Sequence, residues 1–340
     1  MNYGLPYKGS KNKLAPKIFE LFPQKKNFYD LFCGGCAMTH YGMLHNKFEK
    51  FIINDINPMC PTLFFDAING KFKNETRWIS REDFLNSNEP YVKFCWSFGN
   101  NLKSYLYSEE IEPYKKACHY AIIFDGFSLI KELCPEVYGV TKEALNGIKN
   151  IKKRRLAFGL SVIKELKRLG DWDLVQNNPL YKSAYWRSGK LDGKNNNLES
   201  LQSQERLQSL ESLERLQSLE RVQRVQRLEQ FSTDYQNVNI YKDSVIYCDI
   251  PYENTNVYTL DKKQNFDFER FYSWCEKQTE PVFISSYKMP EDRFVCIATF
   301  EHRSILSAKA NNKVLEKVFI PKHQASSYRL PGSLFNFDEM

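Results

Sequence analysis

This chain of 340 residues has no long apolar stretch. Crossing a bilayer takes ~18 to 20 consecutive apolar residues, and no run of the sequence approaches that length. The first residues, MNYGLPYKGSKNKLAPK, also lack the apolar segment that defines a secretory signal. Both absences argue against a membrane-spanning or exported protein, and we expect a cytoplasmic one.

A regular cysteine framework is missing as well. The nine cysteines are odd in number and scattered, and several stand inside apolar runs, which is typical of buried thiols in a reducing compartment. Only Cys33 and Cys36 form a close pair. Because no second pair accompanies them, a zinc or redox role is weakly indicated, and we expect no metal.

The composition is that of a globular protein. A hydrophobic content of 42% and an aromatic content of 15% can fill a core, and the length suggests about two domains. The net charge of +7 fits a polyanionic partner without requiring one.

The first third of the sequence predicts a βαβ unit. An apolar strand at Asn27–Leu31 leads through the small-residue loop Cys33–Ala37 into a helix at Met38–Asn46, and a second strand at Phe48–Ile53 ends before Asp55. Such a loop lets a ligand approach the backbone, and an acid after the second strand can bind a ribose. An ordinary turn with Asp55 as a helix cap is the alternative.

The middle of the chain has a different texture. Helical patterns alternate with polar loops from about residue 66 to 189, which indicates an inserted domain. It contains the polar-aromatic segment Trp96–Asn101 and the basic run Lys149–Arg155. The run is either a solvated face or a contact for phosphates.

Residues 198–231 form a low-complexity repeat. Apolar residues recur at every third position, whereas one face of an α-helix needs a mean spacing of about 3.6. On a helix these side chains would spiral around the axis, so we expect a tandem-repeat surface loop and no coiled coil, and a helical or solenoid-like form of that loop stays open. A partner-binding role for the repeat stays open.

A four-residue loop follows a strong strand at Ser244–Cys248. Asp249 offers a carboxylate and Ile250 a backbone carbonyl, while Pro251 stiffens the loop. Two fixed acceptors can polarise the amine of a nucleobase, and Tyr252 can stack on a base that has left its helix. Taken alone, the segment could also be a β-turn.

Further elements follow this loop. A helix is expected at Phe266–Lys277 and a buried strand at Val282–Ser286. In a mostly parallel sheet, the loops after the strands meet at one edge, so Asp30–Cys36, Asp55 and Asp249–Tyr252 could share a cleft.

With these motifs in order, the chain resembles the Dam-type family of DNA adenine-N6 methyltransferases. The segments that carry the resemblance are Pro6–Lys11, Asp30–Gly35, Asn54–Asn57, Asp249–Tyr252 and Phe283–Ser286. The resemblance implies an α/β, Rossmann-like methyltransferase that uses S-adenosylmethionine and carries a mostly helical inserted target-recognition domain. Double-stranded DNA would be the partner.

The resemblance also implies domain limits. The catalytic domain would comprise residues 1–66 and 236–325, and the target-recognition domain residues 67–197. The repeat at 198–231 and a tail at 326–340 complete the chain.

Site residues follow from the same motifs. The catalytic residues would be Asp249, Ile250, Pro251 and Tyr252. The cofactor-binding residues would be Tyr7, Lys8, Gly9, Asp30, Phe32, Cys33, Gly34, Gly35, Asp55, Ile56 and Asp249. The DNA-binding residues would be Lys11, Phe98, Asn100, Asn101, Lys152, Lys153, Arg154 and Arg155.

The sequence departs from the family pattern twice. Cys36 replaces the second glycine of the cofactor loop, which we expect to be tolerated if Gly35 gives the turn its freedom. Ile250 replaces the first proline of the catalytic loop but keeps the carbonyl. An active enzyme is therefore expected.

Three alternatives stay open. Transfer to the N4 amine of cytosine needs the same loop, and a silent DNA-binding regulator could retain the same fold. Methylation of a protein glutamine usually goes with a loop led by asparagine, which Asp249 argues against. We expect a monomer or a weak dimer.

Overall fold

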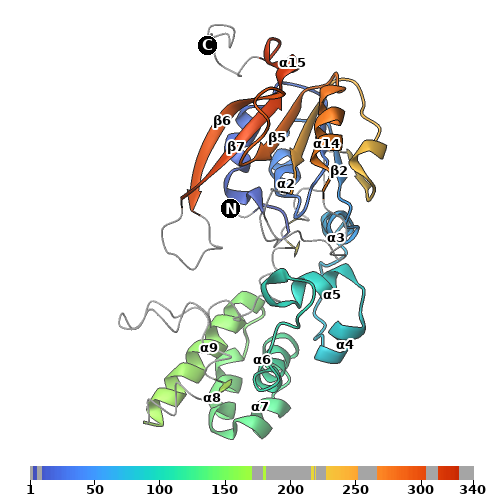
Figure 1. Ribbon diagram of the computed structural model, residues 1–340. Helices are drawn as coiled ribbons and strands as arrows, with labels where there is room; N and C mark the ends of the chain where they lie inside the picture. The colour runs from blue at the N-terminus through green and yellow to red at the C-terminus, as the bar shows by residue number, and fades with distance from the viewer. Residues whose placement is uncertain are drawn as a thin grey trace. The chain divides into compact units, whose positions relative to one another are not determined.

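The computed structural model describes residues 3–5, 10–170, 179–180, 216–217, 219, 227–251, 266–303 and 313–328. The chain divides into two units (Figure 1). The sheet unit consists of Met1–Lys73 and Arg215–Met340, and the helical unit is Asn74–Glu214. No helix among the described residues is long and apolar enough to cross a membrane.

The sheet unit is built on a seven-stranded sheet in the order β3-β2-β1-β4-β5-β7-β6. The strands are β1 Asn27–Asp30, β2 Lys50–Asn54, β3 Arg227–Phe231, β4 Ser244–Asp249, β5 Val282–Ser286, β6 Phe294–Arg303 and β7 Lys313–Pro321. The first five are parallel to one another, while β7 runs antiparallel to β5 and β6. This open, mostly parallel sheet fits the expected α/β, Rossmann-like class.

Helices cover both faces of the sheet. In the sheet unit they are η1 Lys11–Lys13, α1 Ala15–Glu20, α2 Ala37–Leu44, α3 Met59–Ile68, η4 Tyr235–Asn237, α14 Phe268–Glu276 and α15 Lys322–Ala325. All five residues of β5 are buried, as is usual for a parallel strand between two helical layers.

Alternate side chains of the central strands form two cores. Phe28 of β1 points to one face, where its ring centroid lies 5.1 Å from that of Phe19 on α1. Gly42 of α2 approaches this core so closely that an added Cβ would lie 2.6 Å from Phe19. A larger residue at this point of α2 would push the helix off the sheet.

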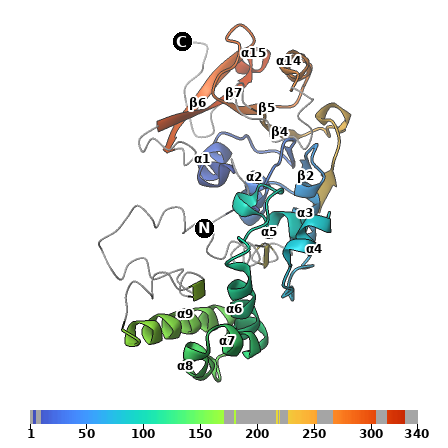
Figure 2. The same cartoon turned by 60° about the horizontal axis from the view of Figure 1, so that its bottom comes forward.

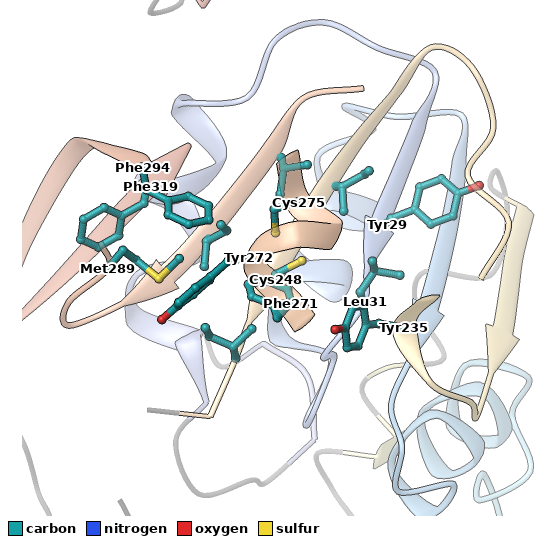
Figure 3. Close-up of a cluster of buried hydrophobic side chains, with 14 of the residues drawn as sticks. Tyr29, Leu31, Tyr235, Cys248, Phe271, Tyr272, Cys275, Met289, Phe294 and Phe319 are labelled. Carbon is teal, nitrogen blue, oxygen red and sulfur yellow. The ribbon is translucent and has the colours of Figure 1, made fainter. Parts of the chain in front are cut away.

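The opposite face packs against α14. Tyr29 of β1 and Cys248 of β4 lie in one buried cluster with Phe271 and Cys275 of α14 (Figure 3). Asp267 begins this helix by accepting a hydrogen bond from the backbone N–H of Arg270. This packing fixes the ends of β1 and β4, beside which Asp30 and Asp249 lie.

The described part of the helical unit consists of helices joined by short turns (Figure 2). They are α4 Arg81–Asn86, α5 Pro90–Cys95, η2 Phe98–Asn100, α6 Glu112–Phe124, α7 Ser128–Leu133, α8 Pro135–Leu145 and α9 Ile151–Arg168. Prolines in the first turns of α5, α6 and α8 fit helix starts, where no hydrogen bond is lost. The buried Ile122, Val137 and Phe158 join α6, α8 and α9 in one core.

We expect a surface loop for the triplet repeat, but the end of the repeat belongs to the sheet. Arg227–Phe231 is strand β3 and pairs with β2. Leu216 and Leu219, one repeat apart, are fully buried, and Gln217 donates to the carbonyl of Phe72 at 3.0 Å. Pairing with the edge of β2 explains why Arg227–Phe231 forms a strand, which the period of three does not reveal. Most of the predicted repeat lies outside the described residues.

Candidate active site

Three neighbouring strands end at one edge of the sheet. β1 lies between β2 and β4 and runs parallel to both, so the residues after these strands come together. The strand order also reverses at β1, and ligands of open α/β sheets bind at such switch points. Asp30, Asp55 and Asp249 lie at this edge, which we call the carboxyl edge.

The loop after β1 is tied to the end of β2. The N–H of Gly34 donates to Oδ2 of Asp55 at 2.9 Å, and the N–H of Cys33 donates to the carbonyl of Asn54 at 2.9 Å. Two residues of this loop have left-handed backbone conformations, Gly34 with φ 44° and Cys36 with φ 55°. Their combination turns the chain from β1 into α2.

The expected freedom of Gly35 is not what makes this turn. Gly35 has no positive φ, whereas Cys36 itself adopts the conformation that glycine favours. A residue with a Cβ pays ~1 to 2 kcal/mol for it. The side chain of Cys36 is fully buried at the start of α2.

A short N-terminal segment lies on the same loop. The N–H of Leu5 donates to the carbonyl of Gly35 at 2.6 Å, and the N–H of Gly4 donates to Nδ1 of His40 at 2.9 Å. Gly4 has φ 68°, and an added Cβ would lie 2.2 Å from the carbonyl oxygen of Gly35. The predicted cofactor residues that follow, Tyr7, Lys8 and Gly9, lie outside the described residues.

Asp55 turns towards the loop rather than capping the next helix. Its Oδ1 accepts the N–H of Asn57 at 2.9 Å, while Oδ2 accepts that of Gly34. Helix α3 begins at Met59, and its N-cap residue Pro58 makes no side-chain cap, so the capping alternative does not hold. Burial raises the pKa of Asp55 more than these two bonds lower it. Ile56 next to it is 67% exposed.

Asp30 is the most deeply buried of the three carboxyl groups. It is 2% exposed and accepts a hydrogen bond from Oγ1 of Thr39 at 2.8 Å. Burial raises the pKa of Asp30 to about 7; the Thr39 bond opposes this shift, and the negative charges of Asp249 and Asp55 add to it. The group therefore changes its charge near neutral pH.

Asp249 is held by a buried lysine. Nζ of Lys11 donates to both carboxylate oxygens of Asp249, at 2.6 and 2.7 Å, and lies 3.8 Å from Oε1 of Glu316 on β7. Lys11 is 8% exposed and Glu316 is 1% exposed. Sequence reasoning missed Glu316, because one glutamate within the strand KVLEKVFI resembles an outward-facing residue.

We had assigned Lys11 to DNA contact, and the structure gives it a different neighbour. Its ammonium is buried against Asp249, so no open basic surface is formed there. Within the predicted catalytic loop, Ile250 is buried and Pro251 is half-buried. Tyr252 lies outside the described residues, so its stacking role stays a prediction.

A second set of residues at this edge was not predicted. The side chain of Asn54 donates to the carbonyls of Leu31 and Thr233, both at 3.1 Å, and so joins the ends of β1, β2 and β3. Tyr235 follows, with its ring centroid 5.4 Å from that of the half-buried Phe32. The repeat that precedes β3 hides this signal in the sequence.

The cysteines of the loop are buried free thiols. Burial raises the pKa of Cys33 and of Cys36, which disfavours the reactive thiolate. No group of histidine, cysteine and acidic residues in the described part of the chain has an arrangement that could hold a metal ion. The pair is part of the packing of the loop after β1.

In the helical unit, the predicted DNA residues after Trp96 form a tight loop. A bridge between Ser97 and Tyr105 closes it. The side chain of Asn100 donates to the carbonyl of Phe94 at 2.8 Å, and Oδ1 of Asn101 accepts two backbone N–H groups. Both amides thus shape the loop, while the ring of Phe98 is 37% exposed.

The basic run is divided by the helix that contains it. Lys152 and Lys153 are exposed on α9, whereas Arg155 is 3% exposed. Arg154 donates to the carbonyls of Ala121, Ile122, Leu145 and Ile148 and to the carboxylate of Asp125. The predicted phosphate contacts of Arg154 and Arg155 are therefore corrected: helical periodicity turns both inward.

Comparison with known proteins supports the methyltransferase assignment. The family model described as D12 class N6 adenine-specific DNA methyltransferase matches residues 7–133. The match includes the carboxyl-edge residues up to Asp55 and ends before Asp249. No curated protein matches the chain. This match bears out the predicted methylation of adenine in DNA and favours adenine over the cytosine alternative. Over residues 7–133 the chain is similar to the D12 class of N6 adenine-specific DNA methyltransferases.

Proposed function

We propose that this enzyme takes its methyl group from S-adenosylmethionine and transfers it to an adenine that has been flipped out of duplex DNA. The position of Asp249 carries the proposal, because its carboxylate ends β4 beside the loop that joins Gly34 to Asp55. An acceptor for the adenine amine and a loop for the methyl donor are thereby neighbours on one sheet.

The charges of the carboxyl edge fit this cofactor. S-adenosylmethionine carries a sulfonium and an ammonium group, and it supplies an electrophilic methyl group when bound. The pKa values of Asp30 and Asp55 are raised chiefly by burial. A positive charge nearby favours the ionised form of a carboxyl group, so a cationic ligand would offset part of this cost.

The neighbours of Asp55 suggest how the cofactor is oriented. Each oxygen of Asp55 accepts one backbone N–H, and a carboxylate oxygen has a second lone pair for a ribose hydroxyl. Ile56 offers an exposed apolar contact for the adenine ring of the cofactor. Gly34 and Gly35 would lie along its methionine end, together with Phe32 and Lys8.

Asp249 and the carbonyl of Ile250 would act on the target amine. The lone pair of adenine N6 is delocalised into the ring, which makes it a poor nucleophile. Two acceptors for its N–H groups increase the electron density on nitrogen and fix its direction of attack. Methyl transfer would form the new N–C bond and break the S–C bond of the cofactor, and the amine would then release one proton to water.

We assign recognition of the duplex to residues 67–197. The exposed Phe98, Lys152 and Lys153 are the DNA contacts that we retain from the sequence. Base flipping is part of the proposal because the N6 amine of a paired adenine is enclosed in the stack. We further propose a monomer or weak dimer that works where bacterial or phage DNA lies, in the cytoplasm.

Methyl transfer from labelled S-adenosylmethionine to duplex DNA tests this proposal. Replacing Asp249 by asparagine should lower kcat by about 100-fold or more, because a charged acceptor is lost, while cofactor affinity changes little. Asp243→Asn is the matched control, since it removes a more exposed carboxylate just before β4, with a side chain 45% exposed. It should keep the wild-type rate.

The product distinguishes the alternatives. Mass spectrometry of the digested DNA should find N6-methyladenine. N4-methylcytosine would contradict the choice of base. A wild-type protein that binds duplex DNA and the cofactor but transfers no methyl group would instead be a silent regulator, and equal rates for Asp249→Asn and wild type would refute the proposed catalytic loop.

A further inference from the structure

Glu316 is a buried carboxylate in a sheet strand. It lies on β7 opposite Phe300 of β6 and is 1% exposed. The buried Val318 and Ile320 follow on the same strand. Removing a carboxylate from water costs free energy that an apolar residue would not cost, and a well-packed apolar replacement often makes a fold more stable. The stability of the sheet alone therefore does not explain Glu316.

A buried cation lies close to this carboxylate. Nζ of Lys11 lies 3.8 Å from Oε1 of Glu316, which is an ion-pair distance rather than a hydrogen bond. The same ammonium donates to both oxygens of Asp249 at 2.6 and 2.7 Å. One ammonium on η1 thus faces two carboxylates, which come from β4 and β7.

The bonds from Lys11 oppose the role proposed for Asp249. An ammonium held by both oxygens withdraws charge from the carboxylate and makes it a weaker acceptor for the adenine amine. Lys11 would have to weaken one of these bonds as the amine binds. In a buried place this is costly unless another negative group compensates the ammonium.

We infer that Glu316 is a positioning residue for methyl transfer: as the second counter-ion of Lys11, it lets the ammonium yield one oxygen of Asp249 to the adenine amine. The inference rests on the proposed function of Asp249. In this role Glu316 acts through Lys11.

The charges around Lys11 favour a change of its hydrogen-bond partner over the loss of its proton. Burial alone would lower the pKa of Lys11, but the charges of Asp249 and then Glu316 outweigh it and raise the pKa. Tyr287, which is 39% exposed, adds a smaller contribution. Lys11 is therefore protonated at neutral pH in this arrangement.

Two replacements of Glu316 separate its charge from its shape. Glu316→Gln keeps the shape and removes the charge, and it should lower kcat by about 10- to 100-fold while KM for duplex DNA and for S-adenosylmethionine changes less than about threefold. Glu316→Asp keeps the charge at a greater distance and should give an intermediate kcat. Glu301→Gln is the matched control, because Glu301 is an exposed residue of β6 in the same hairpin.

A wild-type kcat in Glu316→Gln, or a kcat for the glutamine variant that equals or exceeds that of the aspartate variant, overturns the inference. Thermal unfolding of each variant shows whether it is folded. If the glutamine variant does not fold, the aspartate variant decides: a lower kcat at unchanged KM supports the inference, and a wild-type kcat overturns it.

The roles of Asp249 and Glu316 can be tested separately. If Asp249→Asn keeps the full rate, the proposed catalytic loop is wrong whatever Glu316 does. If Asp249→Asn loses activity while Glu316→Gln keeps it, only the role of Glu316 is wrong.

Discussion

Buried charges have opposite consequences in the two units. At the carboxyl edge of the sheet unit, Asp30 is buried next to other carboxylates and its pKa is raised to about 7. In the helical unit, the guanidinium of Arg154 donates to four backbone carbonyls and to Asp125. A charge whose hydrogen bonds are satisfied stabilises a fold, whereas a charge kept at a cost in stability marks a functional site.

Replacing Arg154 is the strongest test of this contrast. Arg154→Ala should lower the free energy of unfolding by about 3 kcal/mol, because the carbonyls that end α6 and α8 lose a buried donor. Urea unfolding followed by circular dichroism measures this loss. Lys153→Ala, one position earlier on the same helix, is the control and should unfold at the wild-type urea concentration.

The contrast between the two units would be contradicted if Arg154→Ala affected DNA binding and not stability. An Arg154→Ala protein of wild-type stability but weak DNA binding would make Arg154 a phosphate contact after all. The distinction between a helix-bound arginine and exposed lysines in one run would then be lost.

Asp30 provides the opposite test in the sheet unit. Its pKa is raised in the folded state, so the unfolded chain holds fewer protons between pH ~4 and ~7 and stability falls as pH rises through this window. Asp30→Asn removes this cost and should stabilise the protein by about 2 kcal/mol at pH 8 and by almost nothing at pH 4. Thermal unfolding at several pH values measures the difference.

The same substitution should weaken the cofactor site. If Asp30 helps to hold a cationic ligand, affinity for S-adenosylmethionine in the wild type should decrease as pH falls below about 7, and calorimetry of Asp30→Asn should find weaker binding with little dependence on pH. A variant that is destabilised at pH 8 would show that the charge of Asp30 supports the fold.

Motifs predicted the sheet unit better than composition predicted the helical unit. The strands that end before Asp55 and at Asp249 follow from buried runs, and parallel pairing then brings their ends together. Glu316 could not be predicted, because its neighbours Lys11 and Asp249 are far from it in the chain. The run Lys152 to Arg155 misled us, because adjacent residues on a helix point about 100° apart.

Replacement of the exposed lysines of α9 should have a smaller effect, on DNA binding rather than on stability. Replacing Lys152 and Lys153 together by alanine should lower DNA affinity by about tenfold at low salt. The slope of log affinity against log salt concentration should fall by the amount expected for about two phosphate contacts. Stability should stay within ~0.5 kcal/mol of wild type, as for most surface changes. Fluorescence anisotropy at several salt concentrations provides the measurement, and an unchanged salt slope would mean that this face is only solvated.

The smallest effect is expected from shortening the triplet repeat, provided that the deletion ends early enough. Removal of residues 198–214 spares Leu216, Leu219 and strand β3, and should leave methyl transfer and thermal stability close to wild type. Removal of residues 198–229 should unfold the edge of the sheet, because it deletes most of β3, which pairs with β2. The residues just after β3 also contact the carboxyl edge, where Asn54 donates to the carbonyl of Thr233 and Tyr235 packs against Phe32. Methyl transfer and melting temperature of the two deletions measure the difference. Equal loss in both would mean that the early repeat is also part of the folded enzyme, and equal retention would mean that β3 does not support the site.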